Sequence, residues 1–223
     1  NSANVGVSKV PDERLDVLAS IYNPQRVVPA EVSYIDVPPP PEGFGDTKGI
    51  SGEYLNALQS SDALLIVARS FSNPSVPHIN QTIEPYRDIT DLLLEINFSD
   101  LGIIERRISK INQGYKGASN QERESLTKEL NLMEELKALL EKGIALRDID
   151  LSYDQNKLAS GFSLLSIKPL LIVMNISESD IEQSLKLDDK LESSFPGPRI
   201  RTAAICAQLE MELSQMSDSE ESD

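Results

Sequence analysis

An asparagine and a glutamate follow an unbroken apolar run late in the sequence. The run LLIVM at residues 170–174 is typical of a strand buried on both faces, and Asn175 and Glu178 come just after it. In open α/β sheets, ligand-binding side chains lie where parallel strands end. An amide and a carboxylate at such a place can hydrogen-bond the polar edge of a ligand. A helix cap or turn residue is the competing interpretation of Asn175, and Ser177 could cap the next helix equally well.

Cysteine and histidine are scarce. Cys206 is the single cysteine, which excludes an internal disulfide and a CxxC metal site. His78 is the single histidine, which excludes most zinc sites and catalytic triads. It lies in the proline-rich segment NPSVPH without an acid or cysteine close in sequence, so we interpret it as structural.

The charge of the chain excludes a further class of function. The 223 residues include 21 basic and 36 acidic ones, a formal net charge of -15. Binding a phosphate backbone needs clustered Lys and Arg, so bulk charge does not give this chain a grip on nucleic acid. We interpret the charge as a solvated surface. No segment resembles a signal peptide and no apolar run could span a bilayer, so we expect a cytoplasmic protein.

Strand and helix patterns alternate along most of the chain. Strands are predicted at residues 28–37, 63–68, 170–174 and 202–206, with an edge strand at residues 5–10. Helices are predicted at residues 12–22, 52–59, 154–165 and 179–187. This alternation predicts an α/β fold with a mostly parallel sheet flanked by helices.

Residues 89–143 break the alternation. Apolar residues recur at helical spacing over residues 89–111 and again over residues 126–140, and the glycine-containing turn GYKG lies between the two stripes. The pattern predicts an antiparallel helical hairpin inserted between two strands. Its turn, around Tyr115 and Lys116, is a candidate partner-binding loop, with ordinary solvated surface as the alternative.

These patterns divide the chain into three parts. An α/β domain is predicted from residues 1–88 and 144–216, and the helical hairpin from residues 89–143. Residues 217–223 (SDSEESD) are acidic and poor in apolar residues, so we expect a disordered tail.

A series of short motifs matches one protein family in order. The motifs are NVGV at residues 4–7, VPDERL at 10–15, SDA at 61–63, PH at 77–78, IEP at 83–85, RDI at 87–89, KP at 168–169, NISE at 175–178 and CA at 206–207. Over nearly its whole length the sequence resembles the nucleotide-binding domain of YchF-type Obg-like ATPases. VPDERL together with the N-x-x-E spacing carries the resemblance.

The resemblance implies a P-loop NTPase fold of the translation-factor type with a coiled-coil insertion. Members of the family bind and slowly hydrolyse ATP, usually in preference to GTP, and associate with ribosomes. We therefore expect ATP or GTP with Mg²⁺ as ligands, and a ribosome or protein partner bound through the hairpin. The family continues into a C-terminal TGS domain, and the match ends before it.

The resemblance also implies roles for individual residues. Asn175 would bond to the purine N7 and exocyclic group, and Ile176 would lie against the base plane. Glu178 stands where GTPases carry an Asp that accepts two bonds from guanine, and this longer carboxylate suits relaxed or ATP-leaning selectivity. The backbone at Cys206 and Ala207 would contact the base, although Cys206 equally suits a buried strand end.

The chain departs from the family pattern at the phosphate-binding loop. No G-x-x-x-x-G-K-[ST] motif occurs in the sequence, and by alignment that loop and its strand fall before Asn1. The strand would lie between those predicted at residues 28–37 and 63–68, so its absence would leave two unpaired strand edges. We therefore expect the complete protein to carry the segment upstream.

The second departure is in the phosphate-sensing motif. The family's Asp-x-x-Gly reads Asp36-Val37-Pro38-Pro39 here. Asp36 can still orient Mg²⁺ through water. Pro39 has no N–H to face a γ-phosphate and a fixed φ, so the usual sensing step is not expected.

Two functional hypotheses follow. The first is an ATP- or GTP-binding P-loop NTPase domain that hydrolyses nucleotide slowly as a translation-linked switch, without a catalytic side chain that the sequence identifies. The alternative is a nucleotide-independent protein-interaction module that keeps the scaffold and the hairpin. A GKS/T loop upstream of Asn1 would favour the first.

Overall fold

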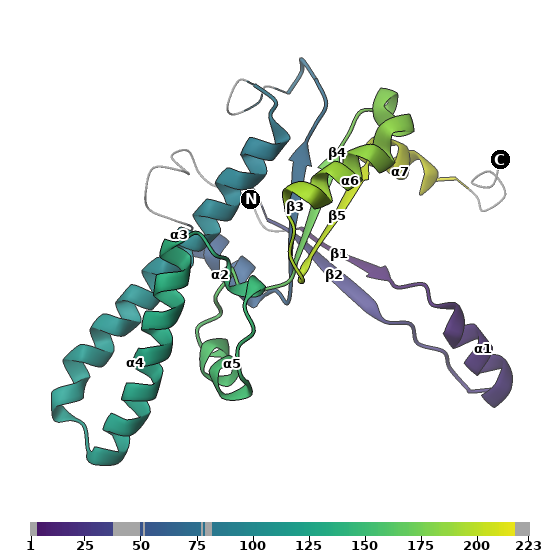
Figure 1. The fold of residues 1–223 in the computed structure, drawn as a ribbon. Coiled ribbons are helices and arrows are strands. Elements are labelled where there is room, and N and C mark those ends of the chain that lie inside the picture. Colours follow the sequence, from purple (N-terminus) through teal and green to yellow (C-terminus); the bar gives the residue numbers. More distant parts are fainter. Residues whose placement is uncertain (1–3, 38–49, 51, 77, 79–81, 217–223) are drawn as a thin grey trace.

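The central element of the fold is a three-stranded parallel sheet. The computed structural model describes residues 4–37, 50, 52–76, 78 and 82–216. The sheet has the order β3-β4-β5, built from β3 (Leu64–Arg69), β4 (Leu170–Asn175) and β5 (Ile200–Ile205). Leu64, Leu170 and Ile200 are register partners, so the three strands run side by side without a stagger (Figure 1). These three strands begin within two residues of their predicted starts.

A second, separate sheet lies at the N-terminal end. It pairs β1 (Asn4–Lys9) with β2 (Glu31–Asp36) in antiparallel fashion, and α1 (Glu13–Tyr22) connects them. In Figure 1 these elements form an arm that extends away from the central sheet. The Asp12 carboxylate caps α1 by accepting the N–H of Arg14.

The prediction of a buried strand at residues 28–37 is wrong in two respects. The strand begins at Glu31, and all six of its residues are exposed, including Val32 and Tyr34. Its register partners are residues of β1, and among the described strands it pairs with no other. A two-stranded ladder without a packed face buries little apolar surface, so the valine and tyrosine side chains stay in contact with solvent.

Helices flank the central sheet and project from it. The remaining helices are α2 (Gly52–Ser60), α3 (Pro85–Gly114), α4 (Asn120–Glu141), α5 (Tyr153–Ser160), α6 (Ser184–Ser194) and α7 (Ala207–Leu213), with 3₁₀ turns at Tyr115–Gly117, Leu146–Asp148 and Glu178–Gln183. The helix predicted at residues 179–187 is thus a 3₁₀ turn followed by α6. None of the helices in the described part of the chain combines the length and apolarity that crossing a membrane requires.

The two longest helices form the predicted antiparallel hairpin. It is inserted between β3 and β4, and α3 already begins at Pro85, so it crosses the boundary predicted after residue 88. A capping box between Ser119 and Glu122 starts α4, and Gly143, at φ +77°, follows its end. Packing between the helices comes from buried residues on both: Ile104 of α3 and Leu132, Met133, Leu136 and Leu140 of α4.

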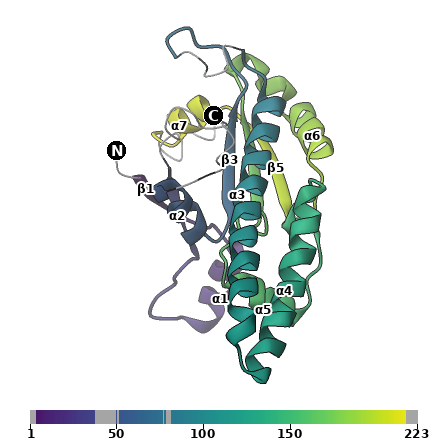
Figure 2. The same cartoon turned by 90° about the vertical axis from the view of Figure 1, so that its left-hand side faces the viewer.

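The main core lies between one face of the sheet and the base of α3. Leu64, Ile66 and Ala68 of β3 are buried with alternate residues of β4, and Ile89 and Ile96 of α3 belong to the same cluster (Figure 2). On the opposite face of β3, Leu65 and Val67 are 45% and 61% exposed. The prediction that both faces are covered therefore does not hold for β3 within the described residues.

A buried carboxylate joins the hairpin to the sheet. Asp100, in the middle of α3, is fully buried, and its two oxygens accept the N–H groups of Leu165 and Ser166 at 2.8 and 2.7 Å. These N–H groups belong to the segment that leads into β4. Burial raises the pKa of Asp100, while the N–H donors and the nearby charge of Arg147 oppose that rise.

The two hydrogen bonds to Asp100 explain why the helix is shorter than the one predicted at residues 154–165. The helix α5 ends at Ser160, and Ser163 follows in a left-handed conformation at φ +49°. Since Asp100 takes the N–H groups of Leu165 and Ser166, those groups do not need helical carbonyls as partners.

One buried and one half-buried cation complete the same polar cluster. Arg147 is 2% exposed and donates to the carbonyl of Lys168 at 2.9 Å, while its backbone N–H donates to the Ser166 carbonyl. The Lys168 ammonium donates to the carbonyls of Gln59 and Ser61, at the end of α2. The segment entering β4 is therefore tied to the hairpin and to α2 through hydrogen bonds.

We expect Asp100→Asn to destabilise the full-length protein by about 1–3 kcal/mol, because an amide can accept only one of the two N–H groups and leaves the other unpaired. The measurement is the urea concentration at half-unfolding. Asp91→Asn on the exposed side of the same helix is the control and should change the unfolding free energy by less than about 0.5 kcal/mol. Equal stability of the two variants would contradict the structural role of Asp100.

Candidate functional site

The carboxyl ends of the three parallel strands meet at one edge of the sheet. Arg69, Asn175 and Ile205 are register partners at the ends of β3, β4 and β5. Two backbone hydrogen bonds continue the pairing past the strands: Ser70 N–H donates to the Asn175 carbonyl at 2.8 Å, and Ile176 N–H to the Ile205 carbonyl at 2.9 Å. This edge is where a parallel α/β sheet presents groups to a ligand.

The Asn175 side chain is oriented by a neighbouring loop. Its Oδ1 accepts the backbone N–H of Ala207 at 3.1 Å, although the two residues lie 32 positions apart. Because the amide oxygen must face that donor, the amide NH₂ group faces away from it. Within the described residues that NH₂ group has no hydrogen-bond acceptor. The structure therefore brings together two predicted site residues and leaves the two N–H donors of Asn175 for another partner.

Ile176 and Cys206 are core residues in this structure. Ile176 is 2% exposed and Cys206 is 7% exposed, and both belong to the main apolar cluster. Cys206 is also the N-cap residue of α7, and its carbonyl accepts the N–H of Glu210 at 3.1 Å. A contact of the Ile176 side chain with a base would require it to be uncovered. The roles of both residues toward a base stay predictions.

Glu178 is exposed at the start of the 3₁₀ turn that follows β4. The N-cap residue of this turn is Ser177, whose hydroxyl donates to the Asp180 carboxylate at 2.6 Å. Asn175 is therefore not the cap residue of this turn, although its side-chain oxygen accepts the first N–H group of α7, as a helix-capping residue would. The Glu178 carboxylate is accessible to a ligand that approaches the sheet edge.

Asp36 ends β2 and is exposed. In the part of the chain that the structure describes, no group of three or more His, Cys, Asp or Glu side chains is arranged to hold a metal ion. The role of Asp36 toward Mg²⁺ stays a prediction. Pro38 and Pro39 of the altered phosphate-sensing motif, and the tail at residues 217–223, lie outside the described residues.

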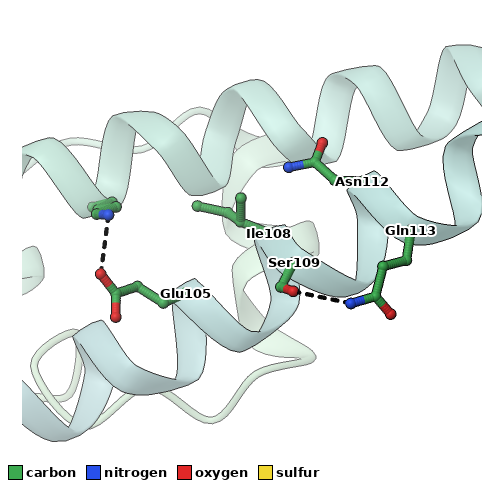
Figure 3. Close-up of a pocket in the computed structure, with 6 residues that line it drawn as sticks. Glu105, Ile108, Ser109, Asn112 and Gln113 are labelled. Carbon is green, nitrogen blue, oxygen red and sulfur yellow. Dashed lines mark hydrogen bonds and ion pairs between the residues drawn. The ribbon is translucent and has the colours of Figure 1, made fainter.

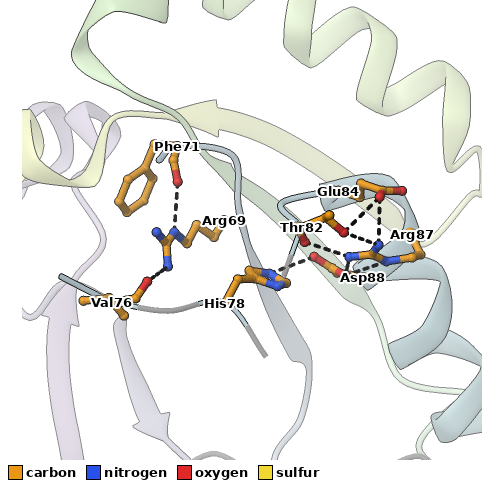
Figure 4. A network of polar contacts seen from close by, with 8 residues as sticks. All are labelled: Arg69, Phe71, Val76, His78, Thr82, Glu84, Arg87 and Asp88. Atoms are coloured by element: carbon orange, nitrogen blue, oxygen red, sulfur yellow. Dashed lines mark hydrogen bonds and ion pairs between the residues drawn. The ribbon is translucent and has the colours of Figure 1, made fainter. Parts of the chain in front are cut away.

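His78 has an acid partner in space, although no acid lies close to it in sequence, and its interpretation as a structural residue stays a prediction. Its Nε2 lies 3.1 Å from Oδ2 of Asp88, and the two side chains are 16% and 20% exposed (Figure 4). The other oxygen of Asp88 accepts from Arg87 at 2.9 Å, and Arg87 also donates to the Thr82 carbonyl. Asp88 lies ten positions downstream in the first turn of α3, a separation that no local sequence pattern would signal.

A cation also organises the loop that follows β3. The Arg69 guanidinium donates to the carbonyls of Phe71, Asn73 and Val76 at 2.9, 3.2 and 2.8 Å, and it lies 5.0 Å from the centre of the Phe71 ring (Figure 4). These bonds engage the guanidinium in holding the loop after β3, on the same sheet edge as Asn175.

A groove on the hairpin is separate from this edge. It is lined by Glu105, Ile108, Ser109, Asn112, Gln113 and Lys137 (Figure 3). Glu105 and Lys137 form an ion pair at 2.9 Å across the two helices. The lining provides hydrogen-bonding groups and one ion pair.

Comparison with known proteins identifies similar sequences that share one name. The chain is 30% identical over 217 residues to the ribosome-binding ATPase YchF of Pasteurella multocida, covering 97% of this chain and 58% of that protein. It is 27% identical over 219 residues to the ribosome-binding ATPase YchF of Bacillus subtilis, covering 97% and 59%. The chain thus spans less than two thirds of the length of these relatives. No protein-family model matches it.

A solved structure has the same fold. The structure of the Schizosaccharomyces pombe YchF GTPase superimposes with a TM-score of 0.80 at 23% sequence identity, covering 97% of this chain and 59% of that one. The likeness confirms the predicted fold class, an α/β P-loop NTPase fold with an inserted helical hairpin.

We expect Asn175→Ala in the full-length protein to lower the unfolding free energy by about 0.5–1.5 kcal/mol, because the Ala207 N–H loses its acceptor. Asn175→Asp keeps an acceptor oxygen at that place and should cost less than the alanine variant. Urea unfolding of both variants checks this order. A loss in Asn175→Asp as large as in Asn175→Ala would mean that the bond to Ala207 does not stabilise the sheet edge.

Proposed function

Since this chain belongs to the YchF-type family of Obg-like ATPases, we propose that it supplies the base-recognition part of a nucleotide-binding domain for ATP or GTP. The family is one of nucleotide-binding ATPases. The proposal rests above all on Asn175, whose amide is held by the Ala207 N–H at the carboxyl edge of the sheet, with its NH₂ group available to a ligand.

Base recognition would use groups from two loops. The Asn175 NH₂ group can donate to the purine N7, which is an acceptor in both adenine and guanine. Glu178 is exposed two residues after Ile176 and can accept from donors on the edge of the base. Guanine presents an N1–H and an N2–H₂ there, whereas adenine lacks both, so the longer glutamate favours ATP or relaxed selectivity. Cys206 and Ala207 would bound the base from the loop before α7.

Hydrolysis would proceed through phosphate positioning rather than covalent chemistry. Asp36 is an exposed carboxylate at a strand end, and carboxylate oxygens are the ligands that Mg²⁺ takes in proteins, usually together with waters. The ion, when bound, would neutralise charge on the phosphates. Because Pro39 has no N–H to sense the γ-phosphate, we propose slow turnover.

We further propose a ribosome-linked role in the cytoplasm. The relatives from Pasteurella multocida and Bacillus subtilis are named ribosome-binding ATPases. The hairpin of α3 and α4 is the element that projects from the sheet, and Figure 2 shows it reaching beyond the strands along its whole distal half. An element with its own packed core can make contacts at its far end without disturbing the nucleotide edge.

The alternative is a nucleotide-independent interaction module. One observation favours it: the Ala207 N–H, which the family assigns to the base, is bonded to Asn175. Under this alternative the hairpin and the α/β scaffold would bind a protein partner, and the full-length protein would not bind ATP or GTP at any physiological concentration.

The experiment that tests the proposal is calorimetric titration of the full-length protein with ATP and with GTP in the presence of Mg²⁺. We expect binding, and we expect Asn175→Asp to weaken it about tenfold or more, because the aspartate keeps the bond to Ala207 but has no N–H donors for a purine. Asn112→Asp on the hairpin makes the same charge change elsewhere and should leave affinity unaltered. The absence of binding in the wild type would favour the interaction module.

Selectivity provides an independent test of Glu178. We expect Glu178→Asp to shift the ATP-to-GTP affinity ratio toward GTP by about tenfold or more, as a charge-assisted hydrogen bond of about 1.5–3 kcal/mol is gained with guanine. Glu182→Asp, also exposed in the same 3₁₀ turn, is the matched control. An unchanged ratio in Glu178→Asp would remove this residue from the site.

A further inference from the structure

A chain of side-chain hydrogen bonds encloses Glu178 in the turn that follows β4. The Ser177 hydroxyl lies 2.6 Å from Oδ2 of Asp180 and 2.7 Å from the Ser179 hydroxyl. A carboxylate can only accept, so the one hydrogen of the Ser177 hydroxyl is donated to Asp180, and Ser179 donates its own hydrogen to the Ser177 oxygen. The residues on both sides of Glu178 thus belong to one network that ends on the Asp180 carboxylate.

The bond between Ser177 and Asp180 is a strong one. An O–H group that donates to an ionised carboxylate at about 2.5–2.7 Å forms a charge-assisted hydrogen bond. The backbone closes the same turn, because the Asp180 N–H donates to the Ser177 carbonyl at 3.0 Å. Residues 177–180 are therefore held together by a side-chain bond and a backbone bond between the same two residues.

Apolar packing fixes the two ends of this turn. Ile176, directly before it, is 2% exposed, and Ile181, directly after Asp180, is half-buried against the same apolar cluster. Because both isoleucines pack in the core, the turn cannot shift along the sheet edge without uncovering apolar surface. The backbone that carries Glu178 is thus fixed at both ends as well as across the turn.

The side chain of Glu178 is the one in this turn that stays outside the network. It is exposed, and within the described residues its carboxylate has no hydrogen-bond or ion-pair partner. The Asp180 carboxylate, in contrast, already accepts from Ser177. The turn therefore presents the Glu178 carboxylate to the sheet edge from a backbone whose position is fixed.

A fixed backbone makes the length of the Glu178 side chain decisive for the choice of base. Guanine presents two donors, N1–H and N2–H₂, which a carboxylate accepts together only at the right distance. A glutamate is longer than an aspartate by one carbon–carbon bond, about 1.5 Å. On a fixed turn this extra length brings the carboxylate too far forward for guanine, whereas a turn that could draw back by the same length would remove the misfit.

We propose that Ser177 and Asp180 are positioning residues for base selectivity, which close the turn and hold Glu178 where its length disfavours guanine. This inference rests on the proposed function, in which Glu178 meets the edge of the base. Neither Ser177 nor Asp180 needs to touch the nucleotide. Loosening the turn lets the glutamate draw back and accept the guanine donors, so selectivity shifts toward GTP while Glu178 itself is unchanged.

The test is the ATP-to-GTP affinity ratio of the full-length protein with Mg²⁺, measured by calorimetric titration. Asp180→Ala removes the acceptor of the Ser177 hydroxyl, and we expect the ratio to move toward GTP by about fivefold or more. The ratio is the proper readout, because the loss of one negative charge changes the affinity for both triphosphates to the same extent. Asp180→Asn loses the same charge but keeps an acceptor oxygen, so its ratio should stay within about twofold of the wild type.

Two further variants complete the comparison. Ser177→Ala removes the donor of the same bond and should move the ratio in the same direction as Asp180→Ala, so the test does not depend on the folding of a single variant. Asp189→Ala, at an exposed position of α6, removes the same side chain outside the turn and should leave the ratio unaltered.

A combination with Glu178→Ala separates positioning from a general loosening of the sheet edge. Since Asp180 is proposed to act through Glu178, Asp180→Ala should change the ratio by less than about twofold once Glu178 is replaced by alanine. A shift of equal size in both backgrounds would overturn the proposal, and so would an unchanged ratio in Asp180→Ala; either result leaves the proposed nucleotide function standing. Absence of ATP and GTP binding in the wild type would instead refute the proposed function, and this inference with it.

Discussion

The position of the whole sheet edge depends on one buried carboxylate. Asp100 accepts two backbone N–H groups from the segment before β4, and Arg147 holds two further groups of the same segment. Burial raises the pKa of Asp100, which means that the charged form is stabilised only by these donors and the nearby guanidinium. Burying a charged group without partners would be strongly unfavourable, so hairpin and sheet must fold around the same cluster.

That anchor determines where the candidate site lies. The segment held by Asp100 and Arg147 leads directly into β4, and β4 ends at Asn175. There the Asn175 carbonyl accepts from Ser70 and its side chain accepts from Ala207, so one residue joins the loops that follow all three strands. The site residues are thus positioned by packing and backbone pairing beneath them, together with the one bond between Asn175 and Ala207. This is the arrangement in which a rigid scaffold presents groups on loops.

Periodicity in the sequence was sufficient to predict the elements that bury an apolar face, and insufficient to predict how the other elements are placed. The stripes at residues 89–111 and 126–140 predicted the hairpin, and the LLIVM run predicted β4, because burial imposes these patterns. Val32 and Tyr34 carry a strand pattern too, but no pattern states which strands pair, and theirs remained exposed. The burial of Asp100 did have a signal in the sequence. This acid lies four residues after Ile96 and four residues before Ile104, within an apolar stripe. The pairing of His78 with Asp88 had no such signal.

The polar groups at the sheet edge suit the base of a nucleotide better than its phosphates. Asn175 offers amide donors and Glu178 a carboxylate, a combination that matches the hydrogen-bonding edge of a base, whereas the carboxylate would repel phosphates. Arg69, the cation at the end of β3, gives its guanidinium to three loop carbonyls. Phosphates need convergent N–H groups and cations, and the described residues at this edge do not provide them. A chain with a net charge of -15 would add repulsion. Base recognition is therefore the part of nucleotide binding that we propose for these residues.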